Sequence, residues 1–122
     1  MLFDLTTAPI FCPIVCDFYS GMEVTVPLFA KDVKGGAEAI KEVYKNLYTG
    51  PVINYKENGG EGGLLASNAF TGKDCMEVTV LGNEERILLV ARFDNLGKGA
   101  SGAAVECMNI ALGKDPICGL EV

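Results

Sequence analysis

The 122-residue chain carries 16 acidic and 10 basic residues, has a formal net charge of −6 and contains no histidine. Its composition, 49% hydrophobic and 21% charged, is that of one globular domain and excludes an intrinsically disordered chain. Because its Lys and Arg residues form no run, we expect no nucleic-acid partner. Without histidine the chain cannot build a Ser-His or Cys-His nucleophile or an imidazole general base.

The start of the chain has the features of neither a secretory signal nor a membrane anchor. The segment MLFDLTTAPIF lacks a basic region, and no stretch approaches the ~18 apolar residues of a membrane span. We therefore expect a cytoplasmic protein without a membrane partner. The five cysteines are odd in number and form no CxxC pair, which favours reduced thiols. Cys12 and Cys16 could hold a metal, but no second pair lies nearby, so we predict no metal site.

The first part of the sequence predicts an irregular segment followed by a strand. Residues 1–20 carry two prolines and show no regular period. Apolar and other residues alternate in 22–29, which predicts a half-buried strand, and Pro27 places that strand at a sheet edge or a bulge. The positions expected on its apolar side are Met22, Val24, Val26 and Leu28.

Residues 37–48 change to helical spacing and predict an amphipathic helix that ends before Gly50 and Pro51. Its apolar stripe consists of Ile40, Val43, Tyr44 and Leu47. Residues 52–55 are a short strand candidate. Residues 56–73 are glycine-rich and weakly patterned, so we predict a loop there. The loop is either a solvated connection or, because its length is unusual in a compact domain, a contact for a ligand or partner.

Residues 75–81 and 86–93 predict a hairpin around a turn at 82–85. The second of these strands is apolar on both faces, which places it in the middle of a sheet. A helix over about 100–112 follows, and Gly113 ends it. The order β-α-β-β-β-α predicts an α+β domain with a mostly antiparallel sheet and helices packed on it.

A glycine pattern separates the last strand from the last helix. Gly97, Gly99 and Gly102 match G-x-G-x-x-G in the context expected of a dinucleotide-binding βαβ unit. That unit needs a second parallel strand after the helix and an acidic residue about 20 positions on. Only residues 113–122 remain, and they contain two glycines and a proline. The sequence therefore excludes a self-contained Rossmann domain.

Two interpretations of this glycine-rich turn stay open. Free N–H groups at the start of the helix, the helix dipole and Lys98 would favour an anion or a polar amide. The alternative is a tight strand-to-helix turn that binds no ligand.

The last helix is apolar on two sides, and one side is a stripe of small residues with one methionine. The stripe consists of Ala100, Ala103, Ala104, Cys107, Met108 and Ala111. A helix with two apolar sides needs cover from two directions. We expect one small sheet to cover one side and a missing domain or a second subunit to cover the other.

Three segments resemble a known family. Residues 94–113, DNLGKGASGAAVECMNIALG, resemble the C-terminal signature of N-acetyl-gamma-glutamyl-phosphate reductase. FCPIVCDFYSGMEVTVPLF, Phe11–Phe29, resembles the family segment that follows a histidine-containing motif. FTGKDCMEVTVLGN, Phe70–Asn83, resembles the stretch before the last hairpin. The matches cover nearly the whole chain in the family's order.

The resemblance implies a two-domain oxidoreductase of arginine biosynthesis. Such an enzyme uses NADPH to reduce an acyl phosphate to an aldehyde through a cysteine thioester, with a histidine as acid and base. Its second domain, of the glyceraldehyde-3-phosphate-dehydrogenase-like C-terminal type, mediates oligomerisation, so a homo-oligomer is expected. The family's last helix packs on the dinucleotide-binding domain, and the loop before it lies by the nicotinamide.

Residues 1–122 are thus expected to form only the C-terminal substrate and dimerisation domain, with helix 100–112 packing on a missing dinucleotide-binding domain. No catalytic residue can be carried over, and Ser20 stands where longer family members have an arginine. The family's cofactor-side element, which implies NADP, matches Asn95, Gly97, Lys98, Gly99 and Ala100. We expect the chain to be inactive alone. The alternatives are a non-catalytic oligomerisation module or an anion-binding module derived from this fold.

Overall fold

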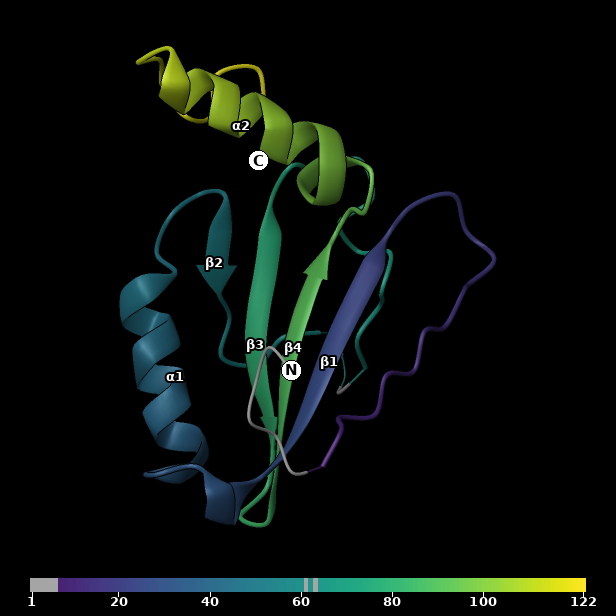
Figure 1. Cartoon of the computed structure of the whole chain (residues 1–122), viewed down its shortest axis with the longest axis vertical. Helices are drawn as coiled ribbons and strands as arrows, with labels where there is room; N and C mark the ends of the chain where they lie inside the picture. Colours follow the sequence, from purple (N-terminus) through teal and green to yellow (C-terminus); the bar gives the residue numbers. More distant parts are fainter. Residues whose placement is uncertain (1–6, 61, 63) are drawn as a thin grey trace.

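The computed structural model describes residues 7–60, 62 and 64–122, and its elements follow the predicted order β-α-β-β-β-α (Figure 1). The main elements are β1 (Met22–Phe29), α1 (Gly36–Leu47), β2 (Ile53–Tyr55), β3 (Met76–Gly82), β4 (Arg86–Phe93) and α2 (Gly102–Ala111). A 3-10 turn, η1 (Ala30–Asp32), follows β1, and a π turn, η2 (Gly97–Ser101), precedes α2. Among the described residues no helix is long and apolar enough to cross a membrane.

The sheet has the strand order β1-β4-β3-β2. β4 runs antiparallel to β1 and β3, and β2 runs parallel to β3. The predicted α+β fold with a mostly antiparallel sheet is therefore confirmed. The inner position of β4 agrees with its apolar character on both faces. β1 lies at an edge, as predicted from Pro27, which has no N–H to give to a ladder.

The two helices lie at different places relative to the sheet (Figure 1). α1 lies along the β2–β3 side, whereas α2 crosses the end of the sheet at which β4 ends. Tyr44 of α1 is half-buried, and its ring meets the ring of Tyr55 in β2 with 6.3 Å between centroids. Val43 and Leu47 of the predicted stripe are exposed instead. Only part of the predicted stripe is therefore covered.

The predicted apolar side of β1 is only partly covered. Met22, Val24 and Val26 keep 40%, 43% and 44% exposure, so the expected half-buried strand is more open than its pattern indicates. The pairing places Val26 on the same face as Leu89 and Val80, and Val80 lies against α1. Because α1 covers this face only near β2 and β3, the part of the chain that the structure describes leaves the β1 side open.

The opposite face of the sheet is covered by the glycine-rich loop. A buried ion pair lies under it, with Arg92 Nη2 donating to Glu77 Oε1 at 2.5 Å. Arg92 Nη1 also donates to the carbonyl of Ala66 at 3.2 Å, and a Cβ at Gly59 would lie 2.9 Å from Thr79. Where it is described, the loop therefore packs on the sheet and is more than a solvated connection. Within the predicted loop and lead-in, residues 1–6, 61 and 63 lie outside the described part.

The apolar core is small and centres on Ile87 and Val90 of β4 and Val80 of β3, each at most 2% exposed.

We expect Ile87→Ala to lower the free energy of unfolding by about 2–5 kcal/mol, because it leaves a cavity in a small core. Urea denaturation checks this value. Ile10→Ala is the matched control, since Ile10 is 96% exposed and its truncation should change stability by no more than about 0.5 kcal/mol. Equal effects of the two changes would contradict the assignment of the core.

Candidate functional site

The glycine-rich turn is built around the carboxylate of Asp94, the residue that follows β4. Asp94 is 2% exposed. Its Oδ2 accepts hydrogen bonds from the Ser20 hydroxyl at 2.8 Å and from the N–H of Gly72 at 2.6 Å. Its Oδ1 accepts the N–H of Leu96 at 2.7 Å and of Gly97 at 3.1 Å. One side chain thus ties the lead-in, the end of the glycine-rich loop and the turn together.

These contacts decide the charge of Asp94. Burial alone would raise its pKa, but the N–H of Gly72, the Ser20 hydroxyl and the N–H groups of Gly97 and Leu96 outweigh burial and lower the pKa to about 2. Asp94 is therefore a carboxylate at neutral pH. Sequence reasoning missed this residue. The available signal was an acidic residue directly after an apolar strand and before a glycine-rich turn.

The turn does not offer the free N–H groups that one of its two interpretations requires. Four of its amide groups already donate within the chain. The acceptors are Asp94 Oδ1 for Gly97, Lys73 O for Lys98, Asp94 O for Gly99 and Leu96 O for Ser101. An anion could bind these four groups only by displacing the chain's own carbonyl and carboxylate oxygens, which favours the alternative of a tight strand-to-helix turn.

The glycine spacing has a packing explanation. A Cβ at Gly97 would lie 2.5 Å from the carbonyl oxygen of Lys73, and one at Gly102 would lie 2.2 Å from Oδ1 of Asp74. A Cβ at Gly99 would lie 3.1 Å from the ring of Phe93. These glycines let the turn approach the segment before β3. They serve close packing within the chain, whether or not a ligand binds outside.

The polar side chains of the predicted site are also engaged. Asn95 Oδ1 accepts the N–H of Gly21 at 2.8 Å, which ties the turn to the residue before β1. Lys98 Nζ donates to Glu106 Oε2 at 2.7 Å, and only 13% of the Lys98 side chain is exposed. Ser20 is 4% exposed and serves as a donor to Asp94.

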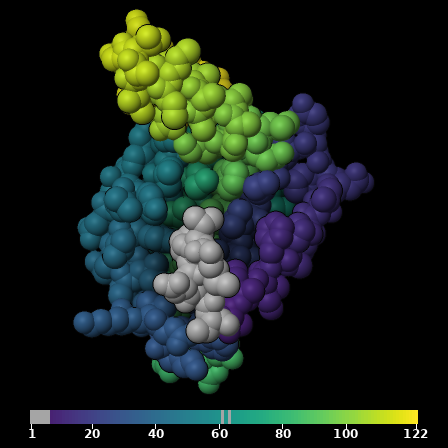
Figure 2. All heavy atoms as spheres, in the orientation of Figure 1, coloured from purple at the N-terminus to yellow at the C-terminus, as the bar shows by residue number. Residues whose placement is uncertain are grey.

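The outer side of the turn and of α2 faces solvent. α2 and the tail that follows it project from one end of the molecule (Figure 2). The exposed residues here include Leu96 at 44%, Met108 at 54%, Ile110 at 58% and Leu112 at 65%, together with Gly99, Ala100, Ala104, Cys107 and Ala111. Most of the predicted small-residue stripe is thus exposed. It has no cover within the described part of the chain.

The inner side of α2 is held by polar contacts that the sequence did not indicate. Asn109 is 6% exposed, and its Nδ2 donates to the carbonyls of Pro116 and Cys118 at 3.1 and 2.9 Å. The backbone of Glu121 then bonds to Asp74, with the Asp74 N–H donating to its carbonyl at 2.7 Å. A lone asparagine in an apolar helix was the only signal for this clamp.

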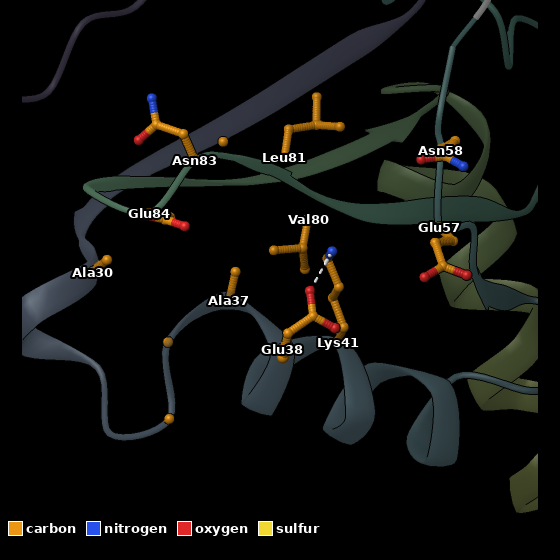
Figure 3. Close-up of a pocket in the computed structure, with 13 residues that line it drawn as sticks. Ala30, Ala37, Glu38, Lys41, Glu57, Asn58, Val80, Leu81, Asn83 and Glu84 are labelled. Atoms are coloured by element: carbon orange, nitrogen blue, oxygen red, sulfur yellow. Dashed lines mark hydrogen bonds and ion pairs between the residues drawn. The ribbon is translucent and has the colours of Figure 1, made fainter.

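A hollow of about 570 Å³ lies elsewhere, between the start of α1 and the β3–β4 hairpin (Figure 3). Its wall carries Glu38, Glu57, Glu84 and Lys41, and Lys41 pairs with Glu38 at 2.7 Å. None of the predicted site residues lines this hollow. Within the described ranges no group of three His, Cys, Asp or Glu side chains is arranged for a metal, and Cys12 and Cys16 are free and exposed.

The fold and the turn define a class of α+β domain. In this class a buried aspartate and a glycine-rich turn follow the inner strand β4 and connect it to a helix with an exposed stripe of small residues. Curated relatives give this class a name. The chain is 39% identical to N-acetyl-gamma-glutamyl-phosphate reductase 2 of Nostoc sp. and 38% identical to the reductase of Trichormus variabilis, over 95% of its length in each. It is 41% identical to the reductase of Brucella ovis over 90% of its length.

The chain is therefore a homologue of part of the N-acetyl-gamma-glutamyl-phosphate reductases, which confirms the resemblance seen in its sequence. It spans only 38–39% of the length of these relatives. No family model matches the chain.

The aspartate contacts predict an acid-sensitive stability. The pKa of Asp94 is about 2 in the folded chain against an ordinary value of 3.8, so the carboxylate stabilises the fold above pH 4 and this stability is lost as the pH falls towards 2. We expect Asp94→Asn to cost about 2 kcal/mol at pH 7 and to remove this part of the acid dependence. Urea denaturation at several pH values measures both, with the exposed Asp17→Asn as control. Parallel pH profiles for Asp94→Asn and the parent chain would contradict the assignment.

The packing of the glycines predicts a second effect. Gly97→Ala places a Cβ 2.5 Å from a backbone oxygen, so we expect a loss of about 1–3 kcal/mol in the free energy of unfolding. Gly50→Ala is the control because a Cβ there meets nothing within 4 Å. Thermal unfolding of both variants compares them directly. Equal melting temperatures would show that Gly97 is not required for packing.

Proposed function

We propose that the chain is the C-terminal, substrate-binding and dimerisation domain of an NADP-dependent N-acetyl-gamma-glutamyl-phosphate reductase of arginine biosynthesis, acting in the cytoplasm. The observation that carries this proposal is the similarity to such reductases at 38–41% identity over 90–95% of the chain. In this reaction NADPH reduces an acyl phosphate to an aldehyde. The chain has no histidine, so the acid-base group of that chemistry must come from outside it.

The exposed side of α2 supports a partner domain. Its apolar residues run from Leu96 to Leu112 along one projecting ridge, next to the glycine-rich turn. A cluster of exposed apolar side chains of this kind is typical of an interaction site. The proposed occupant is the dinucleotide-binding domain of the same enzyme, which would bring the cofactor to the turn. The half-exposed apolar side of β1 supports a homo-oligomer through a second surface, distinct from α2.

Residues Asn95, Gly97, Lys98, Gly99 and Ala100 are the proposed cofactor side of this chain. Asn95 uses Oδ1 for Gly21, and within the described residues its Nδ2 donates no hydrogen bond. That amide fits the carboxamide oxygen of a nicotinamide, a neutral polar group, better than it fits a phosphate. Gly99 and Ala100 are exposed and carry no bulky side chain, which leaves room for a flat ring at the turn. Bound NADPH would supply the hydride.

The turn gives less support to an independent anion-binding module. Four of its N–H groups already donate within the chain, and Glu106 neutralises Lys98. An anion would have to displace these contacts. A cofactor that touches the outer side of the turn would leave them in place.

A segment exchange tests the proposed function. The chain replaces the matching segment of the Nostoc reductase, and we expect the chimera to oxidise NADPH in the presence of the acyl phosphate. In the chimera Asn95→Ala should lower kcat/KM for NADPH by about tenfold, which corresponds to one lost hydrogen bond of about 1.4 kcal/mol. Asn46→Ala is the control, since Asn46 is exposed on α1 and its Nδ2 donates to the carbonyl of Glu42.

The unmodified 122-residue chain serves as the second control in the same assay. We expect no turnover from it, because it lacks a histidine acid-base group. A folded chimera without activity would count against the proposed function. Turnover by the chain alone would show that the chemistry does not depend on another domain.

A further inference from the structure

Lys98 lies in the proposed cofactor turn but does not face outward. Only 13% of its side chain is exposed, and its Nζ lies 2.7 Å from Oε2 of Glu106, whose side chain is 22% exposed. A lysine that binds an outside phosphate keeps its ammonium accessible. Here the ammonium is already paired and turned away from solvent.

The direction of this side chain has a physical cause. Lys98 stands at the start of a helix, where the positive end of the dipole disfavours a cation. Glu106 follows eight positions later, which is about 12 Å along a helix at 1.5 Å per residue. The lysine must therefore lie along the helix axis to reach it. The pair joins the π turn η2 to the second turn of α2.

The ion pair connects the π turn to α2. A π turn is rare, and it occurs mostly as a single turn at functional positions. The backbone of Lys98 is held on the other side, where its N–H donates to the carbonyl of Lys73 at 3.4 Å. Lys98 is thus fixed at both ends, by the segment before β3 and by α2. Between these two contacts the turn presents Leu96, Gly99, Ala100 and Ser101 to solvent.

We propose that Lys98 is a positioning residue of the cofactor site, because its ion pair with Glu106 fixes the π turn Gly97–Ser101. The fixed turn then presents the exposed Leu96 side chain and the Gly99–Ser101 backbone as the contact surface for the nicotinamide end of the cofactor. The proposal rests on the proposed function for the identity of the ligand. The positioning role itself concerns only this chain. Glu106 shares this positioning role as the partner of Lys98, although it lies outside the turn.

Hydrogen exchange on the full 122-residue chain tests the positioning role without any cofactor. Lys98→Met and Glu106→Gln should each speed exchange of the η2 amides by about three- to fivefold, the range for a partly exposed ion pair. The double variant should add little to either change, and Lys98→Arg should keep the slow exchange. Lys114→Met is the matched control, since Lys114 is exposed and follows α2. Unchanged η2 exchange in both single variants would overturn the proposal.

Titration with pyrophosphate separates positioning from direct binding. We expect that Lys98 makes no contribution to pyrophosphate binding in the parent chain or in Glu106→Gln. Saturable binding that strengthens in Glu106→Gln and is lost in Lys98→Met would overturn the proposal, because it would make Lys98 a phosphate contact.

Kinetics in the chimeric reductase complete the test. Lys98→Met and Glu106→Gln should lower kcat/KM for NADPH to the same extent, and Lys98→Arg should restore most of it. A rise in KM that is confined to Lys98→Met would overturn the positioning role. An inactive parent chimera, by contrast, contradicts the proposed function, and the exchange measurements on the chain still decide the role of Lys98.

Discussion

The carboxylate of Asp94 accepts four hydrogen bonds, from a serine in the lead-in, from Gly72 in the loop before β3, and from two amides of the turn that follows it. Burial would normally favour its neutral form, and these donors reverse that tendency. The position of η2, and with it the direction of α2, depends on this one group. Other contacts at this end, such as Asn95 to Gly21, reinforce the same arrangement.

Four amide groups of the turn and the Lys98 ammonium have partners within the chain, so its outer surface offers mostly small and apolar groups. The glycines bring the turn close to Lys73 and Asp74, the ion pair of Lys98 and Glu106 lies along the helix, and the exposed side is left with small and apolar residues. Such a surface suits the flat, weakly polar end of a nicotinamide cofactor and a packed protein partner. It suits a phosphate group poorly.

The proposed partner domain and a second copy of the chain would cover the open surfaces of the domain. The chain matches reductases of more than twice its length, and it leaves the ridge of α2 and one side of β1 uncovered. A domain with a small core and two open apolar surfaces derives part of its stability from what covers them. The same surfaces would join the hydride donor to the substrate domain, so folding and function would share one set of contacts.

The sequence by itself determined the element order, the central position of β4 and the family resemblance, and it limited β1 to an edge or a bulge, because these follow from local periodicity, proline chemistry and a specific motif. It also indicated the two-sided helix. The tertiary structure alone decided how the turn uses its polar groups. Asp94 meets Ser20 across 74 positions, and Lys98 turns to Glu106 instead of outward, because the folded chain supplies nearer partners than any ligand. Spacing in a sequence shows which groups are available, but only packing shows which of them are already satisfied.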